Sequence, residues 1–184
     1  MILEAIVTTV SSNGHLNIAP MGPHFEPACE SFEIRPFETS TTYQNLKNKA
    51  AGVLHVTDDV LLLAKSAINQ LNEIPTTIPA EKVEGRIIKS CCQFFEFTAR
   101  EIPTPEPRKT FHCSIVRSAT LRNFYGFNRA KHAVLEATIL ATRIDFIPIE
   151  EIRQQFSKLK TMVEKTGGHQ ESSAFELLEL YVNS

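Results

Sequence analysis

A turn signal near the start of the chain, Asn13-Gly14, does most to limit the folds open to this sequence. It separates two segments, 4–10 and 15–20, that are rich in β-branched residues or alternate between apolar and polar side chains. Asn-Gly between two such segments is the strongest short signal for a β-hairpin. The sequence therefore predicts an N-terminal hairpin, and Met21-Gly22-Pro23 ends its second strand.

Four more segments have the alternation or the β-branched and aromatic content of strands. We expect these strands over residues 32–36, 52–56, 90–100 and 111–117, with short helices over 43–50 and 60–71. Residues 72–85 contain Pro75 and Pro79, and they are predicted to form a surface excursion. Six strands with so few helices among them favour a compact β-barrel over a doubly wound sheet.

The pattern changes after Leu121, where helical spacing replaces alternation. Helices are expected over 127–144, from Pro148 onwards, and again around residues 174–181. We expect these segments to have too little core to stand far from the barrel. We therefore expect a mainly β protein with α: a barrel domain over residues 1–121 and a C-terminal three-helix appendage over residues 122–184.

Charge and composition narrow the class of function. The formal net charge of -2 over 184 residues argues against a partner held through nucleic-acid phosphates. Hydrophobic residues at 42% and charged residues at 22% are ordinary for a soluble globular protein. No segment approaches the ~20 apolar residues that cross a bilayer, and the first residues do not resemble a signal peptide. We expect a cytoplasmic protein with neither nucleic acid nor a membrane as partner.

The cysteines and histidines show no metal-binding pattern. Cys29, Cys91, Cys92 and Cys113 form no C-x-x-C pair, and the six histidines form no H-E-x-x-H motif. Adjacent residues on a strand point to opposite faces, so Cys91 and Cys92 would not chelate one metal together. We expect buried, reduced thiols and no metal site.

The connection between the strand at 32–36 and the helix at 43–50 is the best candidate for a ligand site. Four consecutive hydroxyl residues, 39–42, follow Arg35-Pro36. Hydroxyls and the N–H groups that open a helix bind phosphate, and the helix dipole also favours an anion there. The same residues fit an ordinary helix cap with an exposed arginine behind it, and the local pattern alone favours this simpler interpretation.

Three other polar patterns leave alternatives open. Asn17 and Ala19 share one face of their strand and are followed by proline and glycine, which would let a flat ligand lie against the backbone or would mark a plain strand end. Asp58-Asp59 fits a cap for the helix at 60–71 better than catalysis or metal binding. A charged row on the helix at 127–144 fits a solvated or salt-bridged edge better than a site for a substrate acid or a buried ion pair. That row consists of Arg129, His132, Glu136 and Arg143.

Several blocks in combination resemble an uncharacterised family of FMN-binding split-barrel proteins from methane- and one-carbon-metabolising microbes. The blocks are Glu4-Ala5-Ile6-Val7-Thr8-Thr9, Asn17-Ile18-Ala19-Pro20-Met21-Gly22, Arg35-Pro36-Phe37 with Thr39, Thr41, Thr42-Tyr43 and Asn45-Leu46, Gly52-Val53-Leu54-His55-Val56-Thr57-Asp58-Asp59, and Gly126-Phe127-Asn128-Arg129-Ala130. The likeness covers most of the chain, and no single block would suffice. More distantly, the arrangement is similar to flavin reductases and pyridoxamine phosphate oxidases.

The resemblance implies a six-stranded split barrel that forms a homodimer, with one FMN per subunit near the interface. It implies that the hydroxyl-rich turn binds the FMN phosphate, which reverses the local preference for a simple cap. The implied phosphate ligands are Arg35, Thr39, Thr41 and Thr42, with Asn45 as a weaker candidate. The strand that begins at Asn17 would run beside the isoalloxazine, whose edge would meet backbone groups of Ile18, Ala19, Pro20, Met21 and Gly22. Phe37 completes the implied cofactor-binding set.

The leading hypothesis for function is an FMN-dependent oxidoreductase of unknown substrate with a small-molecule redox partner, since a flavin carries the electrons itself. No nucleophile, acid–base pair or carboxylate pair in the sequence identifies a catalytic residue. The main alternative is a module that binds flavin or another phosphorylated ligand without turnover. A third is a structural partner of a larger one-carbon enzyme that binds through the helical appendage.

Overall fold

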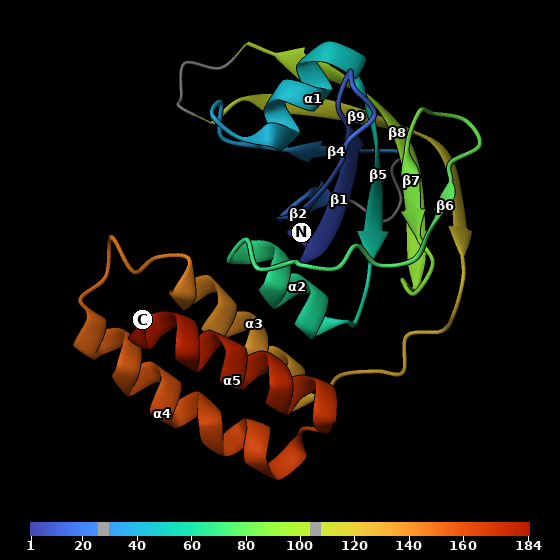
Figure 1. The fold of residues 1–184 in the computed structure, drawn as a ribbon. Coiled ribbons are helices and arrows are strands. Elements are labelled where there is room, and N and C mark those ends of the chain that lie inside the picture. The colour runs from blue at the N-terminus through green and yellow to red at the C-terminus, as the bar shows by residue number, and fades with distance from the viewer. Residues whose placement is uncertain (26–29, 104–107) are drawn as a thin grey trace. The chain divides into compact units, whose positions relative to one another are not determined.

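The computed structural model describes residues 1–25, 30–103 and 108–184, which form two compact units (Figure 1). Residues 1–57 and 74–123 form the barrel unit, and residues 58–73 and 124–184 form the helical unit. Cys29 lies outside the described residues. The elements of the barrel unit are β1 (Ala5–Val10), β2 (Leu16–Met21), β3 (His24–Phe25), β4 (Ser31–Ile34), α1 (Thr41–Lys49), β5 (Ala51–Val56), β6 (Thr77–Pro79), β7 (Arg86–Ile88), β8 (Gln93–Ile102) and β9 (Thr110–Thr120).

The main sheet of the barrel unit has seven antiparallel strands within the described residues, in the order β2-β1-β5-β8-β9-β4-β3. It curls into a half-barrel (Figure 1). The N-terminal hairpin predicted from Asn13-Gly14 is confirmed, with Thr9 of β1 opposite Asn17 of β2. Gly14 has a φ of 82°, the left-handed conformation that glycine adopts without steric cost.

The expected fold class, mainly β with α, is confirmed, but the expected count of six barrel strands is wrong. A seventh strand, β3, pairs with β4 in the described part of the sheet. It has two residues and follows Gly22-Pro23, so no alternation in the sequence signals it. Residues 72–85, expected as a surface excursion, contain β6, which pairs with β7 in a separate two-stranded sheet.

Side chains on the inner face of the main sheet form the core of the barrel unit. All six residues of β1 are buried, because this strand lies between β2 and β5. Ala5 and Val7 of β1 pack in one cluster with Leu54, Phe97 and Phe111 from three other strands. Fully burying a valine, leucine or phenylalanine side chain contributes about 1.5–3 kcal/mol. β1 is therefore the strand that fixes the position of its neighbour β2.

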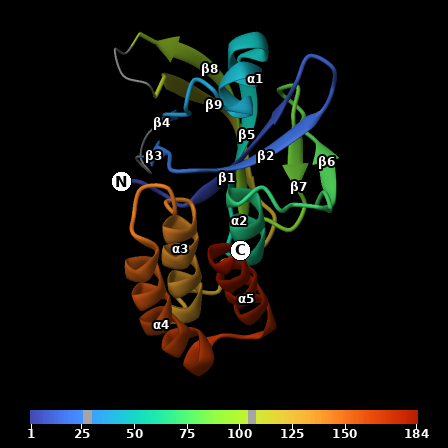
Figure 2. The same ribbon diagram turned by 60° about the vertical axis from the view of Figure 1, so that its left-hand side comes forward.

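The helical unit contains four helices in its described residues (Figure 2). They are α2 (Val60–Ala67), α3 (Arg129–Ala141), α4 (Ile149–Thr166) and α5 (His169–Asn183). The sequence placed the α2 segment in the barrel domain, whereas the structure packs it with the C-terminal helices. The reason is an apolar stripe in which Val60, Ala64 and Ile68 recur every four residues and join the core of those helices.

Local capping in the helical unit follows the sequence. The Asp59 carboxylate accepts a hydrogen bond of 2.9 Å from the backbone N–H of Leu62, which confirms the predicted helix cap at Asp58-Asp59. The predicted charged row is exposed, as expected for a solvated edge: Arg129, His132 and Glu136 lie on α3, and Arg143 follows the end of this helix. None of the helices that the structure describes is long and apolar enough to cross a membrane.

Candidate functional site

The connection from β4 to α1 ends in a serine cap. The Ser40 hydroxyl accepts a hydrogen bond of 3.2 Å from the backbone N–H of Tyr43 and donates one of 2.7 Å to the Phe37 carbonyl. Ser40 itself has extended backbone angles, as an N-cap residue does. Ser40 is therefore the cap, and the hydroxyls of Thr39 and Thr41 on either side of it are exposed.

Thr42 points the other way, into the protein. Its hydroxyl oxygen accepts a hydrogen bond of 3.1 Å from the Asn17 side-chain amide. The same amide nitrogen lies 3.3 Å from the Thr9 hydroxyl oxygen, which also accepts a bond of 3.0 Å from Asn45. We call Thr9, Asn17, Thr42 and Asn45 the Thr9 cluster. It connects β1, β2 and α1 through side chains alone.

The Thr9 cluster brings together the two segments that the sequence singled out separately. Thr9, Thr42 and Asn45 are buried, and Asn17 is half-buried at the edge of the cluster. The Thr9 cluster thus fixes β2, the strand predicted to lie beside the flavin ring (the ring-side strand), next to the start of α1, the helix predicted to bind the phosphate (the phosphate-side helix). Sequence reasoning missed Thr9, although its place on the inward side of a buried strand, after Ala5 and Val7, was a usable signal.

β2 is accessible along its whole length. It ends the described main sheet, and each of its six residues is half-buried, which includes Ile18, Ala19, Pro20 and Met21. Gly22, the last residue of this predicted segment, is exposed. A Cβ atom on Gly22 would lie 3.1 Å from the Ile2 side chain, so this glycine makes room for the N-terminal segment.

Basic side chains surround the turn before α1. Arg35 is half-buried directly after β4. Phe37, which is 51% exposed, has the Arg108 guanidinium 4.2 Å from its ring centre. Lys109 donates its backbone N–H to the Pro36 carbonyl, and its ammonium lies 3.5 Å from the Glu38 carboxylate. Arg108 and Lys109 contact this turn, which carries the Glu38 carboxylate, and Arg35 precedes it in the sequence, so the balance of charge is positive and suits an anion.

The groups with shifted pKa values lie elsewhere. Burial lowers the pKa of His55 to about 4, partly offset by its hydrogen bond to the Ile6 carbonyl. Burial raises the pKa of the Cys91 thiol to about 12, and it also raises the pKa of Cys113, so both thiols are protonated at neutral pH. Among the described residues, no group of histidines, cysteines and acidic side chains is arranged to hold a metal ion.

Two family models match the chain. The N-terminal domain of the family described as "Protein of unknown function (DUF447)" matches residues 3–122, and the C-terminal part of the same family matches residues 128–179. A search of curated proteins gives no match.

Solved structures share the fold. The chain is similar to an FMN-bound DUF447 protein from Methanosarcina mazei, with 21% identity, a TM-score of 0.82, and coverage of 98% of this chain and 94% of that chain. It also resembles nitrilotriacetate monooxygenase component B from Bacillus cereus, with 20% identity, a TM-score of 0.52 and coverage of 65% and 70%. It is similar as well to an FMN-binding protein from Thermus thermophilus, with 14% identity, a TM-score of 0.53, and coverage of 65% of this chain and 70% of that chain. The two family matches together span most of the sequence, and the chain belongs to the DUF447 family.

Proposed function

We propose that this chain binds FMN, with the phosphate at the start of α1 and the isoalloxazine along β2, and that it is a flavin-dependent oxidoreductase. The observation that carries the proposal is the hydrogen bond between Asn17 and Thr42, which joins the ring-side strand to the phosphate-side helix. The related structure from Methanosarcina mazei, which is FMN-bound, supports the choice of ligand.

The phosphate end of the proposed site consists of groups that favour an anion. The hydroxyls of Thr39 and Thr41 are exposed at the start of a nine-residue helix. Arg35, together with Arg108 and Lys109 on the neighbouring segment, supplies positive charge. Hydrogen bonds to a charged phosphate contribute about 1.5–3 kcal/mol each. Thr42 and Asn45 are inside the Thr9 cluster, and their proposed role is to position Asn17 and the helix start.

The ring end is the half-buried strand β2. A planar ring along an edge strand meets backbone N–H and C=O groups, and small residues such as Ala19 let it approach closely. Bound FMN would supply the electron transfer, while these residues place the ring and the phosphate. We propose that a second copy of the chain covers β2 and that a small-molecule redox partner enters beside it.

Binding tests this proposal directly. We expect flavin-free protein to bind FMN at micromolar concentration and riboflavin at least tenfold more weakly, because riboflavin lacks the phosphate. Thr41→Ala should weaken FMN and leave riboflavin unchanged. Thr142→Ala, which removes an exposed hydroxyl in the helical unit, is the control. Failure to bind FMN at micromolar flavin would contradict the proposal.

A flavin-binding module without turnover is the second candidate. It is favoured by the Thr9 cluster, which joins β2 to α1 through threonine and asparagine side chains with no titratable group among them. Anaerobic addition of NADH or NADPH to the yellow protein separates the two candidates. Bleaching of the flavin absorbance supports the oxidoreductase, and an unchanged spectrum with every reductant supports the module.

A further inference from the structure

Three buried polar side chains lie on the outer face of the main sheet, on three strands that are neighbours. Thr8 of β1, His55 of β5 and Glu96 of β8 are each 0% exposed. They alternate with the inward-facing residues Val7, Leu54 and Phe97, which belong to the barrel core. A buried polar group without a partner costs about 1–3 kcal/mol, so the partners of these three side chains matter.

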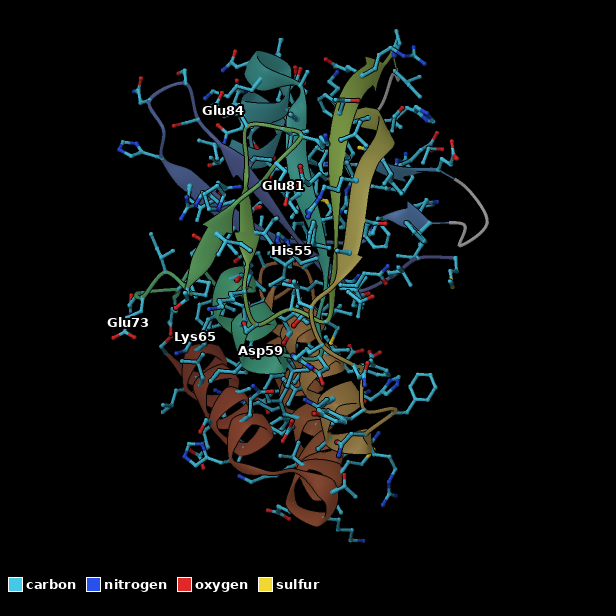
Figure 3. The ribbon with its side chains drawn as sticks, turned by 90° about the vertical axis from the view of Figure 1, so that its right-hand side faces the viewer. His55, Asp59, Lys65, Glu73, Glu81 and Glu84 are labelled. Carbon is cyan, nitrogen blue, oxygen red and sulfur yellow. The ribbon has the colours of Figure 1, made fainter. Side chains whose placement is uncertain are left out.

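All three bind the backbone of one element, the hairpin of β6, its loop and β7, which we call the docked hairpin (77–88). Thr8 donates its hydroxyl to the Arg86 carbonyl at 2.6 Å. His55 Nε2 accepts the backbone N–H of Ile88 at 3.0 Å. The Glu96 carboxylate accepts the backbone N–H of Glu81 at 3.1 Å and that of Lys82 at 2.6 Å. Figure 3 shows His55 among the strands and Glu81 on the hairpin loop.

Two of these three side chains, the His55 imidazole and the Glu96 carboxylate, can gain a proton in acid. We propose that the docked hairpin is an acid-sensitive flap, which protonation of His55 and Glu96 releases as a unit while the main sheet stays folded. The proposal does not depend on flavin binding, because it uses only contacts of the outer face.

His55 holds its proton on the side away from the hairpin. Its Nδ1 lies 3.2 Å from the Ile6 carbonyl and therefore carries the hydrogen, while Nε2 accepts from Ile88. A second proton, on Nε2, would face the Ile88 N–H, and two donors would oppose each other. Burial accordingly lowers the pKa of His55 from 6.5 to about 4. Acid removes this tether and favours a released hairpin with a hydrated imidazolium.

Glu96 is held as a carboxylate by groups from two sides. Burial raises its pKa, but the N–H groups of Lys82 and Glu81 and the guanidinium of Arg117 outweigh burial, so the pKa is lowered from 4.5. Arg117 on β9 binds Glu96 at 3.0 Å and the Glu81 carboxylate at 2.7 Å. Protonation of Glu96 weakens it as the acceptor for the backbone N–H groups of Glu81 and Lys82, and it also weakens the pairing of Glu96 with Arg117.

Other contacts keep the flap closed at neutral pH. Ile87 of the hairpin packs in one cluster with Val53, Cys91 and Phe94. Glu84 on the hairpin loop forms an ion pair with Lys49 at the end of α1, and Arg86 donates to Thr77 within the hairpin. The hairpin shares no ladder of backbone hydrogen bonds with the main sheet among the described residues, because its strands pair only with each other. Side-chain tethers therefore decide its attachment.

Amide hydrogen exchange of the full chain, resolved by residue, tests the proposal between pH 7 and pH 4. A pKa of about 4 in the docked state and 6.5 in the released state predicts that the opening equilibrium rises about a hundredfold through His55 alone. After correction for intrinsic exchange, the protection of Ile88 and Lys82 should fall by at least that factor. The β8–β9 ladder should keep its protection. Unchanged protection of the hairpin at pH 4, or equal loss of protection in hairpin and ladder, would overturn the proposal.

Matched variants assign the effect to the two tethers. His55→Gln and Glu96→Gln are neutral at every pH, so the double variant should lose the pH dependence of hairpin protection. Glu84→Gln removes an exposed carboxylate from the same loop, and this control variant should keep the pH dependence of hairpin protection. Should the double variant fail to fold, NMR titration of the wild-type His55 ring serves instead. His55 should then titrate near pH 4, while the protection of the Ile88 amide falls progressively from about pH 6.5 to that pH; protection that stays constant down to pH 4 would refute the proposal.

Discussion

At the scale of single residues, Thr9 has an influence that its size does not suggest. One buried hydroxyl oxygen accepts the amides of both Asn17 and Asn45, and thereby holds β2 and α1 in place. Valine has the same shape but no acceptor, so Thr9→Val would leave two amide donors without this partner.

We therefore expect Thr9→Val to lower the free energy of unfolding by about 2 kcal/mol or more and to weaken FMN more than riboflavin. Thr9→Ser keeps the hydroxyl, so its stability and its flavin binding should stay close to those of the wild type. Urea unfolding with parallel flavin titration measures them. Equal behaviour of the two variants would contradict a role for the hydroxyl.

Gly52 is the second residue whose replacement the structure constrains closely. A Cβ atom there would lie 2.8 Å from the Phe97 ring and 2.9 Å from the Thr8 carbonyl oxygen, and a backbone atom cannot move aside cheaply. We expect Gly52→Ala to cost about 1–3 kcal/mol of stability, as overpacking of a core does. Gly14→Asn has open space around it and a φ of 82° that asparagine tolerates better than most residues, so it should cost less, about 1 kcal/mol or below. Thermal unfolding of the two variants checks the contrast.

At the scale of elements, the sequence predicted the features that depend on residues close together in the chain. Asn13-Gly14 predicted the β1–β2 hairpin because these residues favour a tight turn, and a tight turn does lie in the short loop between the paired residues Val10 and Leu16. β3 and the β6–β7 pair were missed because strands of two or three residues have no measurable period; β3 also follows Pro23, and β6 ends in Pro79. α2 was predicted as a helix, but its apolar stripe carries no information about which distant helices will cover it.

The same division applies to the candidate site. The Ser/Thr-rich helix start is a local pattern, and the sequence indicated it directly. The bond between Asn17 and Thr42 joins residues 25 positions apart, so it follows only from the packing of α1 against the sheet. Phosphate and ring ligands stay predictions, since the residue pattern also fits a simple helix cap and a plain strand end, and it was the resemblance that favoured a cofactor site.

α2 gives a prediction at this scale. Asp59 caps it, and the unfilled N–H groups at its start lose their acceptor when the carboxylate is removed. Asp59→Ala should destabilise the helical unit by about 0.5–2 kcal/mol, while Asp59→Asn keeps an acceptor oxygen and should cost less. Exchange of α2 amides reports the change. Equal exchange in the two variants would show that the cap contributes nothing.

At the scale of the whole molecule, acid should destabilise the protein. The folded pKa of His55 lies below its ordinary value, so its contribution to stability is complete above about pH 6.5 and is lost as the pH falls towards 4. The shift corresponds to roughly 3 kcal/mol. Glu96 and Glu171, whose pKa values are also lowered, lose their contributions below about pH 4.5. Urea unfolding at pH 7 and pH 5 should give the lower stability at pH 5, and His55→Gln should reduce the difference.

Separate cores imply separate responses to mutation. Leu54 belongs to the core of the barrel unit and Leu178 to that of the helical unit, and both are fully buried. Replacing either by alanine removes apolar contacts and leaves a cavity, which costs about 2–5 kcal/mol. If each core supports its own unit, Leu178→Ala will speed amide exchange in α3, α4 and α5 with little change in the β8–β9 ladder, and Leu54→Ala will do the reverse. Equal acceleration in both units by either variant would show instead that the two cores unfold as one cooperative structure.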